Sequence, residues 1–178
     1  MDKKELQNPA LYTNRELSWL LFNKRVLSEA RDKQLLLFER LKFLSITASN
    51  LDEFFMVRIG SLVDMIHAEY TKKDIAGMSA KEQLDALMEE THKFAALQYS
   101  TYNRMLLPQL RANGLNFVEH HEQLTERQAQ YVDEYFEENV YPVLTPMAVD
   151  SSRPFPLIRN KTLNIGALVA KKGEKDTE

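Results

Sequence analysis

Apolar residues recur at intervals of three and four along most of the first 113 positions. This spacing is typical of amphipathic helices, because about 3.6 residues complete one helical turn. It predicts helices over residues 13–31, 38–46 and 51–70, and a long fourth helix from residue 79 to a stop at Asn113-Gly114. Pro108 is expected to kink the fourth helix. Because short connections join these segments, a four-helix, bundle-like domain is expected over residues 1–114.

Signals for helix starts accompany this pattern. In a capping box, a Ser, Thr or Asn caps the helix and a Glu or Gln three residues later completes the cap, so that free backbone N–H groups are satisfied. Patterns of this kind begin at Thr13, Asn50, Ser79 and Thr125. Asn50 is therefore predicted to begin the third helix, with its amide available for a second role.

The pattern changes at Leu115. Residues 115–118 alternate like a short strand, and a helix is expected from Thr125 to about Asn139. Residues 162–170 again alternate like a strand, and residues 171–178 look like the turn of a hairpin whose partner strand is missing. The predicted fold class is therefore mainly α, with a bundle-like N-terminal domain followed by a partial α+β domain over residues 115–178.

Composition narrows the class of protein. The chain has 178 residues, of which 44% are apolar, as in ordinary globular domains. Its formal net charge of −3 argues against a nucleic-acid binder. The absence of cysteine excludes disulfides, thiolate catalysis and cysteine-ligated zinc. No secretory signal is expected, because no apolar run follows a basic start at the N-terminus, and no transmembrane segment is expected, because the sequence has no apolar run of about 18 residues. A cytoplasmic location is therefore predicted.

Several segments together carry a resemblance to a known family. Residues 14–20 read NRELSWL, and residues 22–27, 39–44 and 49–58 read FNKRVL, ERLKFL and SNLDEFFMVR. They closely resemble the N-terminal domain of the polyphosphate kinases that work through a phosphohistidine. Residues 141–146 and 153–156 are similar to the start of the head domain of that family. The resemblance extends from about Leu11 to about Val169 and implies that the chain is part of a longer enzyme.

The resemblance implies an activity for the whole enzyme, which is the reversible transfer of the terminal phosphate of ATP to polyphosphate with Mg²⁺. The N-terminal helices would cover the nucleotide pocket, and the head domain would mediate contacts within a homo-oligomer. The family is cytoplasmic, and a peripheral association with the membrane stays open.

The resemblance also implies that the catalytic histidine lies outside this chain. None of the four histidines has the family's catalytic context, and the five glycines form no phosphate-binding loop. The expectation is that this fragment holds no catalytic residue and no metal site, is inactive alone, and leaves Mg²⁺ mainly to other parts of the enzyme.

Asn50 is the main candidate for a site residue. Its amide offers a donor and an acceptor side by side, which matches the N6/N7 edge of adenine. In the family, the asparagine at this position binds ATP or ADP, and this role can coexist with capping. Arg58 is a weaker candidate, because it can contact a phosphate or pair with an acidic side chain. Asp52 and Glu53 can hold Mg²⁺ or act in acid–base chemistry, but a helix start also favours acidic residues.

A different class of function also fits the helical pattern. A non-catalytic interaction module would use its apolar stripes to bind a partner helix. A reading frame that continues past Glu178 and encodes a histidine in a phosphate-binding context would favour the kinase.

Overall fold

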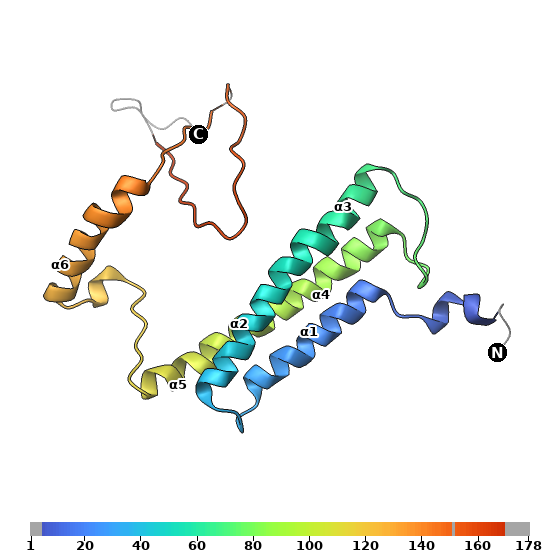
Figure 1. Ribbon diagram of the computed structural model, residues 1–178, viewed down its shortest axis with the longest axis horizontal. Helices are drawn as coiled ribbons and strands as arrows, with labels where there is room; N and C mark the ends of the chain where they lie inside the picture. The colour runs from blue at the N-terminus through green and yellow to red at the C-terminus, as the bar shows by residue number, and fades with distance from the viewer. Residues whose placement is uncertain (1–4, 151, 170–178) are drawn as a thin grey trace. The chain divides into compact units, whose positions relative to one another are not determined.

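The computed structural model describes residues 5–150 and 152–169 (Figure 1). The chain divides into two compact units, Met1–Phe117 and Val118–Glu178, and each is described by itself. The sequence-based boundary after residue 114 stays a prediction.

Two long helical segments begin the first unit. After two short 3-10 turns, Glu5–Gln7 and Pro9–Leu11, helix α1 spans Arg15–Arg31. Helix α2 (Leu37–Phe54) passes through a π-helical turn, Phe55–Ile59, directly into α3 (Gly60–His67). Figure 1 shows α2 and α3 as one uninterrupted rod.

The prediction that Asn50 begins a helix is therefore wrong. Asn50 lies inside α2, and the predicted second and third helices are parts of the same rod. No glycine or proline occurs between Phe38 and Ile59, so nothing in this stretch turns the chain out of the helix. A capping box starts a helix only where the residues before it have left the helical conformation.

A second rod completes the bundle. Helix α4 (Ala80–Thr101) continues through a π-helical turn, Tyr102–Leu106, into α5 (Leu107–Ala112). Pro108 lies in the first turn of α5, immediately after the π-helical turn, where its missing N–H removes one bond of the regular helical pattern. Gly114 follows α5 with a φ of 83°, which glycine adopts readily. The predicted stop at Asn113-Gly114 is confirmed.

Three of the four predicted helix caps are present, and one of these is shifted by one residue. Ser79 and Thr125 form the predicted capping boxes of α4 and α6. At α1 the cap is Asn14 rather than Thr13, because the Asn14 side chain accepts hydrogen bonds from the backbone N–H groups of Glu16 and Leu17.

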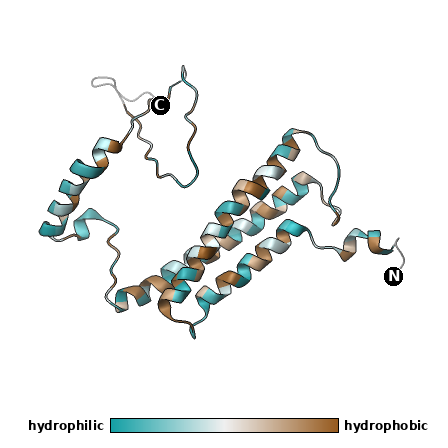
Figure 2. Ribbon diagram, in the orientation of Figure 1, coloured by the Kyte–Doolittle hydropathy of each residue, from teal (hydrophilic) through white to brown (hydrophobic). Residues whose placement is uncertain are grey.

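The core lies where the rods meet, because α1 packs against α2 and α4, and α3 packs against α4. Figure 2 shows apolar and polar residues interspersed along each of these helices, as amphipathic helices require. The buried apolar side chains are Leu20, Leu27, Ala30, Phe54, Ile59, Leu62, Ala80, Leu87, Phe94, Leu106, Leu107 and Leu110.

The second unit has helix α6 (Glu126–Tyr135), followed by a π-helical turn, Phe136–Val140, and a 3-10 turn, Tyr141–Val143. Residues 115–118 and 162–169 do not form the predicted strands, and no strand occurs among residues 118–150 and 152–169. A lone strand has no neighbour to satisfy its backbone groups, so alternation alone does not produce one. The mainly α class is confirmed, whereas the α+β character of this part is not visible. The hairpin turn predicted at 171–178 lies outside the described residues.

No helix in the described part of the chain combines the length and apolar character needed to cross a membrane.

Candidate functional site

A hollow on the surface shared by α1 and α2 brings both predicted site residues together. Asn50 and Arg58 line it, and its cavity volume is about 230 Å³. The remaining lining side chains come from one face of α1 and from the end of α2 with the π-helical turn, and they are Trp19, Phe22, Glu53, Phe54 and Val57.

The π-helical turn explains why residues eight positions apart share this hollow. In a regular helix, with about 3.6 residues per turn, Arg58 would be rotated well away from Asn50. A π-helical turn takes up an extra residue through i to i+5 hydrogen bonds. The Phe55–Ile59 turn therefore returns Arg58 to the face that carries Asn50 and Phe54.

A chain of hydrogen bonds holds the Asn50 amide. The Asn50 Nδ2 group donates to Asn23 Oδ1 at 3.1 Å, and the Asn23 Nδ2 group donates to the backbone carbonyl of Thr47 at 3.1 Å. The Thr47 hydroxyl in turn accepts from Gln98 Nε2 of α4 at 3.0 Å. Asn23 and Thr47 are fully buried, whereas Asn50 is half-buried and reaches the hollow. This hydrogen-bond network joins α1, α2 and α4 on the buried side of Asn50.

Aromatic side chains form one wall. The Trp19 and Phe54 rings stack with their centroids 4.3 Å apart and their planes 8° from parallel. Phe22 is 46% exposed, and the Arg25 guanidinium lies 5.8 Å from its ring centroid. Half-exposed aromatic faces of this kind can stack on a planar ligand.

Charged side chains form the other end. Arg58 Nε lies 3.9 Å from Glu16 Oε2, and Arg15 Nε donates to Glu16 Oε1 at 2.9 Å. The Glu16 side chain is 8% exposed, whereas that of Arg58 is 47% exposed. The acidic pairing foreseen for Arg58 is thus present as a long ion pair, and it leaves the guanidinium accessible from solvent.

The acidic residues at this position do not assemble a metal site. Within residues 5–150 and 152–169, no three His, Asp or Glu side chains lie close enough together to hold a metal ion. Glu53 is exposed at the rim of the hollow.

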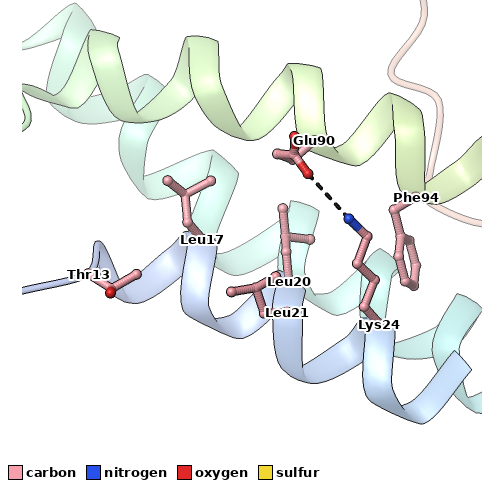
Figure 3. Close-up of a pocket in the computed structure, with 7 residues that line it drawn as sticks. All are labelled: Thr13, Leu17, Leu20, Leu21, Lys24, Glu90 and Phe94. Atoms are coloured by element: carbon pink, nitrogen blue, oxygen red, sulfur yellow. Dashed lines mark hydrogen bonds and ion pairs between the residues drawn. The ribbon is translucent and has the colours of Figure 1, made fainter. Parts of the chain in front are cut away.

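A second hollow, of about 270 Å³, lies between α1 and α4 (Figure 3). Lys24 Nζ and Glu90 Oε2 pair across it at 3.4 Å, and the other side chains that line it are Thr13, Leu17, Leu20, Leu21 and Phe94. It contains no residue predicted to contact nucleotide, and its apolar lining offers little to bind one.

Asn23 is the site residue that sequence reasoning missed. It lies three residues after Leu20 and four before Leu27, so the helical pattern buries it between two core leucines. A polar residue at such a position must find hydrogen-bond partners inside the protein, and this was the available signal. Its proximity to Asn50, 27 positions later, depends on how α1 packs on α2.

The family model of the polyphosphate kinase N-terminal domain matches residues 12–118, and that of the polyphosphate kinase middle domain matches residues 127–178. The chain belongs to the polyphosphate kinase family. The resemblance noted in the sequence is thereby confirmed.

The chain is also similar in sequence to individual polyphosphate kinases. The chain is 52% identical to the polyphosphate kinase of Lactiplantibacillus plantarum over 164 residues, and 46% identical to that of Bacillus anthracis over 165 residues. Each match covers 92% of this chain and 23% of the relative. The chain thus spans about a quarter of the length of these relatives.

A crystal structure of the polyphosphate kinase from Porphyromonas gingivalis has a similar fold, with a TM-score of 0.65 and 31% sequence identity. The match covers 83% of this chain and 20% of that one.

Proposed function

We propose that this chain supplies adenine-nucleotide binding to an enzyme that reversibly transfers the terminal phosphate of ATP to polyphosphate through a phosphohistidine. The observation that carries the proposal is the shared hollow, which brings Asn50 and Arg58 together beside exposed aromatic rings. The fragment has no catalytic role of its own in this proposal, and the histidine comes from another part of the enzyme.

The base end of the hollow suits adenine. The Asn50 amide donates one hydrogen to Asn23 and keeps a second hydrogen and its Oδ1 atom, which can donate to a ring nitrogen and accept from the exocyclic amino group. Trp19 and Phe22 offer aromatic faces on which the flat base can stack.

The charged end suits the phosphates. The accessible guanidinium of Arg58 can donate two hydrogen bonds to phosphate oxygens. Glu16 limits the freedom of Arg58 from behind, because its buried carboxylate lies 3.9 Å from Arg58 Nε. Arg15 shares that carboxylate, so one acid does not fully neutralise the two cations.

Mg²⁺ and the other partners are also part of the proposal. The described residues contain no group of three His, Asp or Glu side chains placed to hold a metal ion, and we assign Mg²⁺ to the nucleotide phosphates and to other domains. Homo-oligomeric contacts through the middle domain and a cytoplasmic location, with peripheral membrane association open, follow from the family.

The test of the base contact uses the full-length enzyme and titration calorimetry with adenosine and a non-hydrolysable ATP analogue. Asn50→Ser should weaken binding of both ligands about three- to tenfold, because serine cannot offer a paired donor and acceptor. Asn103→Ser is the matched control, since it makes the same change at an exposed helical position outside the hollow.

The phosphate contact is tested separately with Arg58→Gln. This change should weaken binding of the ATP analogue several-fold and leave adenosine binding unchanged, because adenosine has no phosphate. Unchanged ATP affinity in both the Asn50 and the Arg58 variant would contradict the proposal and favour a non-catalytic interaction module.

A further inference from the structure

We infer that Asn23 is a positioning residue that fixes the direction of the Asn50 amide, and that this direction makes the hollow prefer adenine to guanine. The inference rests on the proposed function, because it requires Asn50 to face the base.

The orientation of the Asn23 amide is set by the backbone carbonyl of Thr47. The backbone carbonyl of Thr47 only accepts hydrogen bonds, so the Asn23 atom 3.1 Å from it is the amide nitrogen. The other end of the Asn23 amide, Oδ1, therefore faces Asn50. Since Oδ1 also only accepts, the Asn50 atom that meets it is Nδ2, and Asn50 Oδ1 points away from Asn23.

Burial prevents this arrangement from turning round. Asn23 and Thr47 are both fully buried, and a reversed Asn23 amide would place two oxygens together with no water to separate them. Thr47 is itself held, because its hydroxyl donates to the Leu44 carbonyl at 2.7 Å and accepts from Gln98 at 3.0 Å. The hydrogen bond that fixes the Asn50 amide is thus supported by side chains from α1, α2 and α4.

An Asn50 amide held in one orientation distinguishes adenine from guanine at position 6 of the purine ring. One hydrogen of Asn50 Nδ2 is donated to Asn23, so the second hydrogen and Oδ1 remain for a ligand. Adenine presents an amino group at position 6, which donates to Oδ1, with a ring-nitrogen acceptor next to it. Guanine presents an oxygen at position 6, which would repel Oδ1. A freely turning amide would offer its N–H to that oxygen and accept either base.

A merely structural Asn23 would behave differently. It would lower stability when replaced, yet leave the ratio of ATP to GTP affinity unchanged. The ratio is therefore the readout that separates positioning from packing.

The first experiment uses the wild-type full-length enzyme and needs no variant. Binding of ATP, inosine triphosphate and purine riboside triphosphate is compared by calorimetry; these ligands carry an amino group, an oxygen and a hydrogen at position 6. The expected order of affinity is ATP, then purine riboside triphosphate, then inosine triphosphate, with about tenfold between the first and the last. Inosine triphosphate binding more tightly than purine riboside triphosphate would show a freely turning amide and overturn the inference.

The second experiment removes the hydrogen bond between Asn50 and Asn23 with the variants Asn23→Ala and Asn23→Ser. The preference for ATP over GTP should fall at least about threefold in either folded variant. Thr101→Val is the matched control, because Thr101 is also fully buried and its hydroxyl accepts from Arg31 at 2.8 Å, but it does not line the hollow. Its ratio should equal that of wild type.

The outcomes separate the two proposals. If Asn50→Ser weakens ATP binding but the Asn23 variants keep the wild-type ratio, the inference fails and the proposed function stands. If Asn50→Ser leaves ATP binding unchanged, Asn50 does not contact the base and this inference fails; if Arg58→Gln also leaves ATP binding unchanged, the proposed function fails as well.

Discussion

Asn14, at the start of α1, donates a hydrogen bond of 2.7 Å to the Asp74 carboxylate, 60 residues later in the loop before α4. The same amide nitrogen donates to Gln83 Oε1 at 2.9 Å, and Asn14 Oδ1 caps α1. The buried Asn14 side chain therefore links three segments by hydrogen bonds, namely the start of α1, the 68–79 loop and the first turn of α4.

Replacing this side chain should cost more than an ordinary cap. Asn14→Ala is expected to lower the free energy of unfolding by about 2–3 kcal/mol, because the cap is lost together with the hydrogen bonds to half-buried Asp74 and buried Gln83. Asn14→Ser keeps a capping oxygen and should cost roughly half as much. Urea denaturation followed by helical circular dichroism measures both. A loss in Asn14→Ala no larger than about 0.5 kcal/mol would show that the contacts to Asp74 and Gln83 carry no stability.

Gly60 offers a change in the opposite direction. Its backbone is helical, with φ −53° and ψ −50°, and an added Cβ would meet only the Phe55 carbonyl at 3.8 Å, an ordinary contact. Gly60→Ala should raise the free energy of unfolding by about 0.5–1 kcal/mol, because alanine loses less backbone freedom on folding. Gly114→Ala is the control, since its φ of 83° should make the same change destabilising although no atom lies within 4 Å. Equal effects at the two positions would contradict this explanation.

The capping box of α4 should respond to acid. The Glu82 carboxylate accepts from the Ser79 backbone N–H at 2.7 Å, and this hydrogen bond is the main reason that the pKa of Glu82 is lowered. A carboxyl whose pKa is lower when folded stabilises the protein at neutral pH and loses that contribution as the pH falls through the folded pKa.

Glu82→Gln tests this dependence, because glutamine can accept the same hydrogen bond without titrating. The melting temperature of wild type should exceed that of Glu82→Gln at pH 7, and the difference should shrink below about pH 4. Gln128 occupies the same place in the capping box of α6, so Gln128→Glu should introduce a dependence of the same sign. A difference that grows as the pH falls would have the wrong sign for this mechanism.

The sequence predicts most of the bundle because its signals are local. Helical spacing, the caps at Ser79 and Thr125, and the stop at Gly114 each act within one or two turns of chain. The error at Asn50 shows the limit of such signals. A pattern that can start a helix is overridden when the preceding residues already form one, and the burial of Phe54 against Leu20 favours the continuous rod.

The candidate site depends on contacts that no local signal contains. Asn50 was predicted from the family resemblance and Arg58 from the chemistry of its side chain, whereas the hollow that they share depends on the π-helical turn. The contact of Asn23 with Asn50 arises only when α1 packs on α2. The strands expected after residue 114 require pairing partners, which alternation in one segment cannot supply.

The π-helical turn at Phe55–Ile59 gives the α2–α3 rod one residue more than a regular helix of the same number of turns. Deleting a single residue there would make the backbone hydrogen bonding of the rod more regular. Because the extra residue is taken up within the π-helical turn, its loss would leave the two halves of the rod in register. Phe54 and Leu62 would then be seven positions apart, about two regular turns, and both would still face the core. A one-residue deletion elsewhere in the rod, where no π-helical turn absorbs it, would rotate the two halves relative to each other by about 100°. A change of chain length is therefore better tolerated within these five positions than in the regular turns on either side.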